Sequence, residues 1–124
     1  MPKLMWVGLG GFFGALTRYL ISGLVARWCV SFPCGTLFVN VTGSFFLGFL
    51  MTLAAETLVI SPNLRLLLAI GFLGSYTTFS TFAYETNSLL ESNKILEATL
   101  NVGLSVFLGL AGIRLGVWLA RNLL

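Results

Sequence analysis

Long apolar runs dominate this chain, and charged residues mark where each run ends. Residues 30–55 and 66–84 contain no charged residue, and residues 4–25 and 98–120 each contain a single arginine. A helix needs about 20 mostly apolar residues to cross the hydrocarbon core of a bilayer. The pattern therefore predicts four membrane spans, near residues 4–26, 35–57, 64–90 and 96–120.

The apolar runs are continuous, whereas the strands of a membrane β-barrel alternate between apolar and polar residues. A helix satisfies its backbone hydrogen bonds within one segment, so helices are the expected form of each span. The connectors RWCVSFPCG, ISPN and ESNK are short and contain proline or polar residues. The sequence thus predicts an all-α membrane protein, with residues 1–124 forming a single four-helix domain.

The composition agrees with a place in the membrane. Hydrophobic residues make up 57% of the chain and charged residues 9%, whereas a soluble domain has about 25% charged residues. There is no histidine, and the two cysteines, Cys29 and Cys34, lack partners for a zinc site. We expect free thiols near a helix end, with a disulfide as the alternative. The basic residues are scattered, so no nucleic-acid partner is expected.

The balance of positive charge leaves the orientation in the membrane open. With four spans, Lys3, Arg65 and Arg121 lie on one side, and Arg27 and Lys94 lie on the other. A difference of one positive residue does not fix the orientation by the positive-inside rule. Either other features set one topology, or the chain inserts both ways and can form an antiparallel homodimer. Four helices enclose little space, so transport would most simply require a dimer.

Fourteen glycines in so short a chain suggest close contacts between helices. Gly10 with Gly14, and Gly112 with Gly116, have the GxxxG spacing. Small residues at this spacing let the backbones of neighbouring membrane helices approach closely. We expect these pairs to serve helix packing.

The stretch GFLGSYTTFSTFAYE, residues 71–85, is rich in small and hydroxylated residues although it lies within a span. Gly71 and Gly74 weaken a helix, and the serine and threonine side chains compete for backbone hydrogen bonds. We therefore predict a break in the third span near residues 74–78. Broken membrane helices can line protein or water and bind ions with their freed backbone groups. The alternative is an unbroken helix whose hydroxyls bond to the preceding turn.

Beyond the predicted break, rings and hydroxyl groups follow one side of the helix. Phe79 and Phe82 are three residues apart and share a face. Glu85 falls near the same stripe, and Ser80 and Thr81 lie beside it. A phenyl ring has a negative face and a positive edge, so ring edges and hydroxyl groups together suit a small ion. These residues alone do not distinguish an anion from a cation.

Polar residues also lie inside the other spans. Asn40 is costly at membrane depth unless it is paired or solvated, so it either joins helices or donates to a pore. Thr36 lies one turn earlier on the same face, and Asn101 and Ser105 are one turn apart in the fourth span. Arg18 either reaches the membrane interface, attracts anions to a vestibule or pairs with an acidic residue.

The sequence lacks the residue patterns of an enzyme. It has no histidine, no paired buried carboxylates, no nucleophile elbow and no phosphate-binding loop. We therefore expect no enzymatic activity. A path for a small ion is the function that the polar and aromatic stripe favours.

Three segments resemble the CrcB/Fluc family of fluoride channels. They are GGFFGALTRY at 10–19, GTLFVNVTGSFFLG at 35–48 and GFLGSYTTFSTFAYE at 71–85. The pattern G-x-x-G-x-x-T-T-F-S-T-F is far more specific than a GxxxG pair, and the likeness covers nearly the whole chain.

The resemblance implies an antiparallel, dual-topology homodimer with two pores that export fluoride passively. Its place would be the inner or plasma membrane of a prokaryotic cell, in contact with lipid. The third span would be broken at its centre. The backbone carbonyls of Gly74 and Thr77 from both subunits would hold one structural Na⁺ at the dimer centre, since carbonyl oxygens suit a hard cation.

The resemblance also implies roles for individual side chains. Phe79 and Phe82 would line each pore with ring edges, and Asn40 would be the pore amide. Arg18 and Glu85 would lie at a vestibule. The remaining polar residues of the pore would be Thr36, Ser80, Thr81, Asn101 and Ser105.

Two other functions stay open from the sequence. A small four-span multidrug or cation transporter would need a carboxylate inside the membrane, typically in the first span. That span has only Arg18 as a charged residue after Lys3. A non-transporting assembly subunit would explain the glycines but would leave the stripe of phenylalanines and hydroxyls without a role.

Overall fold

The computed structural model describes residues 2–124, and these residues form helices and no strands. Four crossings are long and apolar enough to span a membrane, so the fold is that of a multi-pass membrane protein. The helical segments are α1 (Pro2–Ala26), α2 (Cys34–Glu56), α3 (Pro62–Arg65), η1 (Leu66–Leu73), α4 (Gly74–Tyr76), α5 (Phe79–Glu91) and α6 (Ile95–Leu123). Segments α3, η1, α4 and α5 together make the third crossing.

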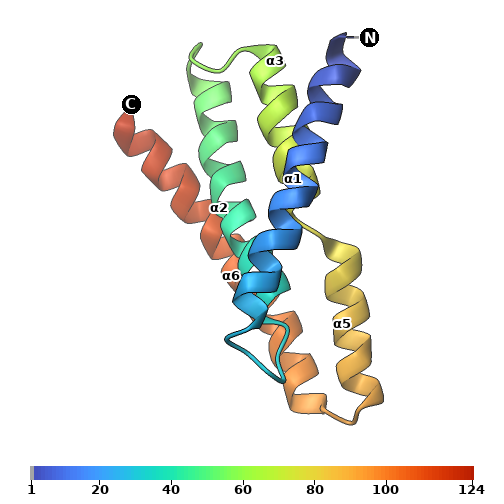
Figure 1. Cartoon of the computed structure of the whole chain (residues 1–124). Helices are drawn as coiled ribbons and strands as arrows, with labels where there is room; N and C mark the ends of the chain where they lie inside the picture. Colours follow the sequence, from blue (N-terminus) through green and yellow to red (C-terminus); the bar gives the residue numbers. More distant parts are fainter. Residues whose placement is uncertain (1) are drawn as a thin grey trace.

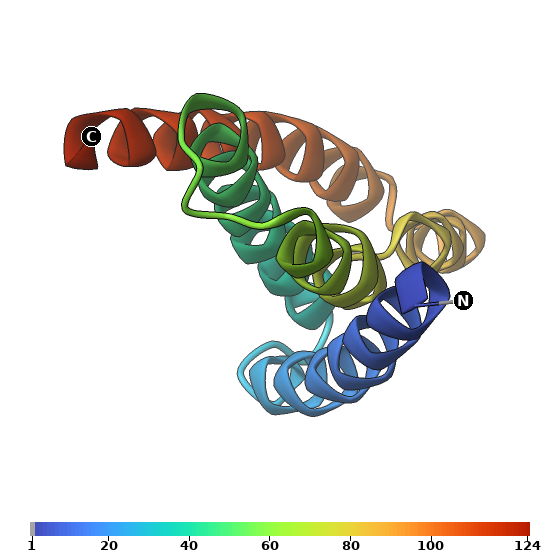
Figure 2. The ribbon, with the colours of Figure 1, turned by 90° about the horizontal axis from the view of Figure 1, so that it is seen from above.

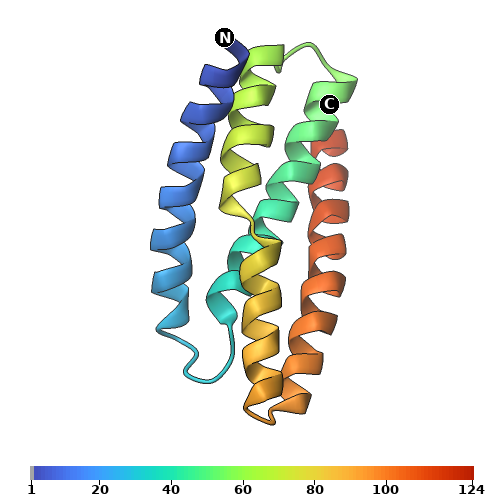
Figure 3. The same cartoon turned by 90° about the vertical axis from the view of Figure 1, so that its right-hand side faces the viewer.

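The connections between the crossings lie at two opposite ends of the molecule (Figure 3). Both termini and the α2–α3 connection lie toward one end, and the α1–α2 and α5–α6 connections lie at the other. This arrangement groups the charges as the four-span pattern predicts. The expected spans overlap the observed helices, with α1 and α6 extending a few residues beyond the expected ranges.

Two close pairs of segments make most of the fold. α6 packs along α2, and α1 packs along η1 (Figures 1 and 2). A Cβ atom at Gly71 of η1 would lie 2.6 Å from the carbonyl oxygen of Val7 in α1. Backbone atoms of the facing segment oppose the glycines of both GxxxG pairs in a similar way. The predicted role of these pairs in helix packing is confirmed.

Substituting alanine for Gly10 is expected to destabilise the fold, because the new Cβ would collide with the backbone of η1 at Leu67 and Phe72. Overpacking of this kind costs about 1–3 kcal/mol. Thermal unfolding of the detergent-solubilised protein measures the loss. Gly8→Ala is the matched control in the same helix, because its added Cβ meets no neighbouring atom within 4 Å. Equal unfolding temperatures for the two variants would contradict the close α1–η1 contact.

The chain has only a small hydrophobic core among its described residues. Val39, Leu73 and Tyr76 form its buried cluster, whereas many large apolar side chains face outward from every crossing. Phe12 of α1 is 60% exposed and Phe107 of α6 is 70% exposed. An outward apolar surface of this extent suits contact with lipid or with a second chain.

The first half of the third crossing contains a π-helix, η1, that the sequence analysis missed. Its hydrogen bonds reach five residues along the chain, and such widened turns are frequent at functional sites. The crossing begins at Ser61, whose Oγ accepts a hydrogen bond from the amide of Leu64 at 3.2 Å. The segment LLLAIGFL is apolar throughout, so its pattern does not distinguish a π-helix from an α-helix.

The connection between α1 and α2 holds a disulfide bond between Cys29 and Cys34. The expectation of free thiols was therefore wrong. α1 ends at Ala26 and α2 begins at Cys34, so the intervening turn, which contains Pro33, folds the chain back on itself. The two Cα atoms lie 6.0 Å apart, within the range that a disulfide bridges.

Candidate functional site

The third crossing is broken at Thr77 and Thr78 (Figures 1 and 3). Both residues have extended backbone conformations, with φ −91° and ψ 155° at Thr77 and φ −150° and ψ 121° at Thr78. Thr78 then caps the new helix α5, since its Oγ1 accepts from the amide of Thr81 at 3.3 Å. The break predicted near residues 74–78 is confirmed.

Asn40 of α2 holds the break by two hydrogen bonds to one residue. Its Oδ1 accepts from the amide of Thr78 at 2.8 Å, and its Nδ2 donates to the carbonyl oxygen of Thr78 at 3.0 Å. In an unbroken helix, the Thr78 amide would instead bond to the carbonyl of Gly74. The Asn40 side chain thus takes the place of the Gly74 carbonyl as the partner of the Thr78 amide. Asn40 joins α2 to the third crossing, which is one of the two roles that the sequence left open.

Arg18 of α1 makes a further hydrogen bond to the backbone next to the break. Its Nε donates to the carbonyl oxygen of Ser75 at 2.9 Å in a partly buried position. The partner of that carbonyl in an unbroken helix would be the amide of Phe79. Arg18 is therefore bonded within the fold, and it is not among the residues that line the cavity around Thr36 and Glu85.

The backbone carbonyls of Gly74 and Thr77 also lose their helical partners at the break. The Thr78 amide turns from Gly74 to Asn40, and the Thr81 amide turns from Thr77 to the hydroxyl of Thr78. Within residues 2–124, no group of three or more His, Cys, Asp or Glu residues could hold a metal ion. The carbonyl oxygens of Gly74 and Thr77 are hard oxygen ligands of the kind that fit Na⁺.

Replacing Arg18 by methionine is expected to cost about 1–3 kcal/mol of stability, because the partly buried Ser75 carbonyl would lose its donor. Thermal unfolding in detergent measures this change. Arg114→Met is the matched control, since Arg114 also lies within a crossing but is exposed. If both variants unfold at the wild-type temperature, the Arg18 hydrogen bond does not hold the break.

A groove of about 340 Å³ lies beside the break. Its lining includes the predicted pore residues Asn40, Phe79, Phe82 and Ser105, brought together from α2, α5 and α6. The ring centroids of Phe79 and Phe82 are 5.7 Å apart, and the ring planes are inclined by 51°. Phe79 is 79% exposed, so this side of the groove is open at the surface of the chain.

Ser105 brings a hydroxyl group with an unmet hydrogen bond into this groove. Its Oγ is buried and has no hydrogen-bond partner among the described residues. A buried polar atom without a partner costs about 1–3 kcal/mol. Among the described residues, the Ser105 hydroxyl is thus a hydrogen-bond donor beside the groove that the fold itself does not use.

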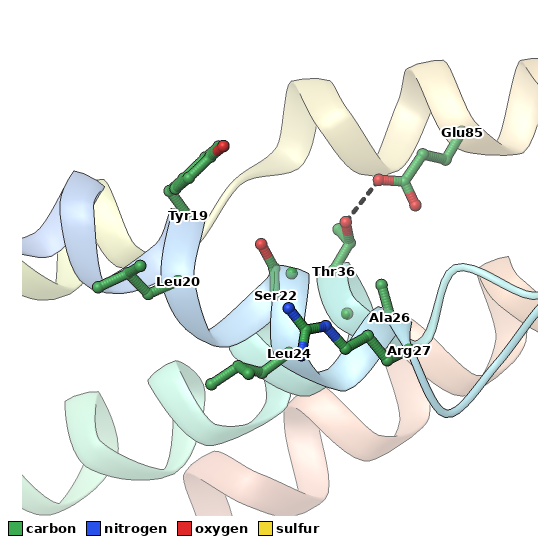
Figure 4. A pocket seen from close by; sticks show the side chains of 10 residues that line it. Tyr19, Leu20, Ser22, Leu24, Ala26, Arg27, Thr36 and Glu85 are labelled. Carbon is green, nitrogen blue, oxygen red and sulfur yellow. Dashed lines mark hydrogen bonds between the residues drawn. The ribbon is translucent and has the colours of Figure 1, made fainter.

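A second cavity of about 480 Å³ lies between the end of α1, the start of α2 and α5 (Figure 4). Glu85 and Thr36 meet there, with the Thr36 Oγ1 donating to Glu85 Oε1 at 2.5 Å. Arg27, directly after the end of α1, lines the same cavity. Glu85 was predicted from the sequence to lie at a vestibule, whereas no role was predicted for Arg27 there. Its place immediately after the apolar run of the first span was the available signal.

The remaining predicted residues fall into two groups. Ser80 and Thr81 lie near the cap of α5, where the Thr78 Oγ1 donates to Thr81 Oγ1 at 3.2 Å and lies 3.5 Å from Ser80 Oγ. Asn101 is 2% exposed and its Nδ2 donates to the Thr86 Oγ1 at 2.9 Å. Asn101 thus joins α6 to α5 and is not among the residues that line the groove.

A small membrane protein with four crossings, a broken helix and a polar, aromatic groove beside the break has the construction of an ion-channel subunit. A family model described as CrcB-like protein, Camphor Resistance (CrcB), matches residues 5–117. The chain belongs to the CrcB family. The resemblance found in the three sequence segments is therefore confirmed.

Close relatives extend along almost the whole chain. Fluoride-specific ion channel FluC 1 of Methanosarcina acetivorans is 46% identical over 123 residues, covering 99% of this chain and 94% of that protein. FluC of Geobacter sulfurreducens is 47% identical over 124 residues, covering 99% and 100%. FluC of Hydrogenovibrio crunogenus is 44% identical over 121 residues, covering 97% and 92%. All three are named as ion channels, so membership of this family confirms that the protein is not an enzyme.

Proposed function

We propose that this protein is a fluoride-specific channel that exports F⁻ passively and so lowers its concentration in the cytoplasm. The observation that carries the proposal is the groove in which the amide of Asn40 and the unpaired hydroxyl of Ser105 meet the rings of Phe79 and Phe82. The relatives named as fluoride-specific channels support the choice of ion.

The chemistry of the groove favours a small anion that accepts strong hydrogen bonds. A hydroxyl or amide donor and the positive edge of a phenyl ring all stabilise an anion. None of the groove-lining residues carries a full positive charge, so a weakly accepting anion would gain little on leaving water. Fluoride is the small anion that gains most from such donors.

A second copy of the chain is the proposed partner that closes the groove. The Phe79 ring is largely exposed on the protomer, which leaves an apolar surface beside the groove for a second copy to cover. The near-equal positive charge at the two ends supports insertion in both orientations. An antiparallel homodimer would contain two grooves and hence two pores, within the plasma membrane of a prokaryotic cell.

A structural Na⁺ is the proposed ion at the centre of this dimer. The carbonyl oxygens of Gly74 and Thr77 fit it, since Asn40 and Thr78 take over the amides that would otherwise occupy them. Gly74 is exposed on the protomer, so its carbonyl region is available to a second copy. When bound, the ion would be held by the Gly74 and Thr77 carbonyl oxygens of both subunits and would offset the partial negative charge on those oxygens.

The other predicted residues take supporting places in this proposal. Thr36, Ser80, Thr81 and Glu85 supply hydroxyl and carboxylate oxygens at the cap of α5 and at the vestibule. Arg27 brings positive charge to the vestibule and would attract anions there. Arg18 and Asn101 serve the fold around the pore, through the bonds to Ser75 and Thr86.

The direct test is fluoride efflux from liposomes that contain the purified protein. An electrode outside the vesicles should record rapid F⁻ release once a potassium ionophore removes the opposing voltage. Protein-free vesicles treated in the same way are the control. If F⁻ stays trapped until detergent is added, the proposed function is wrong.

Exchange of Na⁺ for a larger cation tests the ion at the dimer centre. Purification with N-methylglucamine in place of Na⁺ is expected to weaken the dimer and to lower F⁻ efflux, because bulky cations do not fit between converging carbonyls. Size-exclusion chromatography and the efflux assay measure the two effects. Return of Na⁺ should restore both. An unchanged dimer and unchanged efflux after prolonged dialysis would argue against the site.

A further inference from the structure

The disulfide bond between Cys29 and Cys34 lies in a connection whose neighbouring residues line the vestibular cavity. Arg27, two residues before the first cysteine, lines this cavity. Gly35 and Thr36, directly after the second cysteine, line it as well. The disulfide therefore fixes the chain between the two segments that form one wall of the vestibule.

Both cysteine side chains are partly accessible. Cys29 and Cys34 are neither fully buried nor fully exposed, and Trp28 and Val30 beside them are 88% and 103% exposed. The connection has few backbone hydrogen bonds of its own between residues 30 and 33. Exchange with an external thiol or disulfide requires this kind of access.

The redox surroundings of this loop depend on the membrane face on which it lies. Disulfides persist on the extracytoplasmic side, whereas cytoplasmic thiols are kept reduced. The α1–α2 connection lies at one end of the protomer (Figure 3). In the antiparallel dimer, on which this inference rests, one copy of the loop faces the cytoplasm and its partner's copy faces outward.

We infer that the Cys29–Cys34 pair is oxidised in one subunit of each dimer and reduced in the other. On the outer face, the two thiols would pass two electrons and two protons to the disulfide of an extracytoplasmic thiol oxidant. The products are the Cys29–Cys34 disulfide and the oxidant's dithiol. On the cytoplasmic face, the reverse exchange with a dithiol reductant keeps both cysteines as thiols.

This difference makes two vestibules of identical sequence unequal. The outward-facing vestibule has the chain between Arg27 and Thr36 closed by a covalent bond. The cytoplasmic one has the same segment open and freer to move. The redox state of the two cysteines thus distinguishes the two ends of an otherwise symmetric channel.

Differential alkylation in intact bacteria with a periplasmic disulfide-forming system tests the inference. N-ethylmaleimide, which crosses membranes, first blocks free thiols in whole cells. The protein is then denatured, reduced and treated with deuterated N-ethylmaleimide. Mass spectrometry of the peptide containing Cys29 and Cys34 should find about half with two light labels and about half with two heavy labels. A uniform population, or peptides with one label of each kind, would overturn the inference.

A membrane-impermeant maleimide shows on which side of the membrane the reduced copies of Cys29 and Cys34 lie. It should not label the thiols of intact cells, and it should label them after permeabilisation. Labelling of these thiols in intact cells would show partial oxidation on the outer face and would overturn the inference.

A separate variant distinguishes this inference from the proposed dimer. Ser92 is exposed in the α5–α6 turn at the same end of the protomer. In a Cys29→Ser, Cys34→Ser background, Ser92→Cys should be half accessible to the impermeant maleimide if the topology is dual. If the Ser92→Cys thiol is half accessible in this variant but the wild-type Cys29–Cys34 peptide carries only one kind of label, the redox inference is wrong and the proposed dual topology stands. The background variant should still release F⁻, which tests the proposed function independently.

Discussion

Replacing Asn40 by aspartate is expected to reduce fluoride efflux at least about 100-fold, the largest effect of any single substitution considered for this protein. The aspartate keeps an acceptor for the Thr78 amide but loses the Nδ2 donor to the Thr78 carbonyl. The aspartate also brings a carboxylate oxygen next to that carbonyl oxygen, and the two repel each other. It adds a negative charge to the lining of the groove, which repels an anion. A hundredfold loss corresponds to about 2.7 kcal/mol in the barrier.

Two measurements separate the causes of this loss. Thermal unfolding reports how far the break is disturbed, and efflux reports the barrier for the anion. Asn40→Leu removes both hydrogen bonds without adding charge, so it should unfold at a lower temperature than wild type. Asn63→Asp is the control, because Asn63 is exposed in the first turn of α3, where a negative charge is favourable. If Asn40→Asp shows wild-type efflux and stability, the two hydrogen bonds between Asn40 and Thr78 do not hold the break.

The second large effect is expected for the two rings of the groove. Phe79→Ile and Phe82→Ile should each lower F⁻ efflux about tenfold or more, which corresponds to about 1.4 kcal/mol in the barrier. Isoleucine keeps an apolar side chain of similar size but has no positive ring edge to offer an anion. Efflux from liposomes and the dimer fraction on size exclusion are the two readouts.

Phe12→Ile is the matched control for the ring substitutions. Phe12 of α1 is 60% exposed and contacts none of the cavities described here. It should leave efflux unchanged. If Phe79→Ile and Phe82→Ile also conduct at the wild-type rate, ring edges do not line the path. A loss of the dimer in either variant would instead assign the rings to subunit contact.

Much of the fold follows from the sequence because the membrane imposes simple requirements. Each crossing needs about 20 apolar residues, and charged residues end those runs, so the four helices and their connections are predictable. The break is predictable as well. Glycines at 71 and 74 weaken the helix, and the hydroxyl groups after them, with Thr78 as the clearest case, offer the backbone other partners.

The predictions that were wrong or missing concern features that the local sequence pattern does not specify. Cys29 and Cys34 have no histidine or further cysteine nearby, and from this the sequence analysis expected free thiols. The turn at Pro33 decides that they meet. The π-helix η1 has the same apolar content as an α-helix. Arg27 was predicted only as a charge on a connector, although it lines the cavity that contains Thr36 and Glu85.

The sequence by itself determined which residue types stand within each crossing, where the third crossing is weak, and the family to which the chain belongs. Only the tertiary structure decided which groups meet at the break. Asn40 bonds to a residue 38 positions away, and Arg18 to one 57 positions away. Hydrogen bonds depend on distances of about 3 Å and on direction, and spacing along one helix does not specify the helix that faces it.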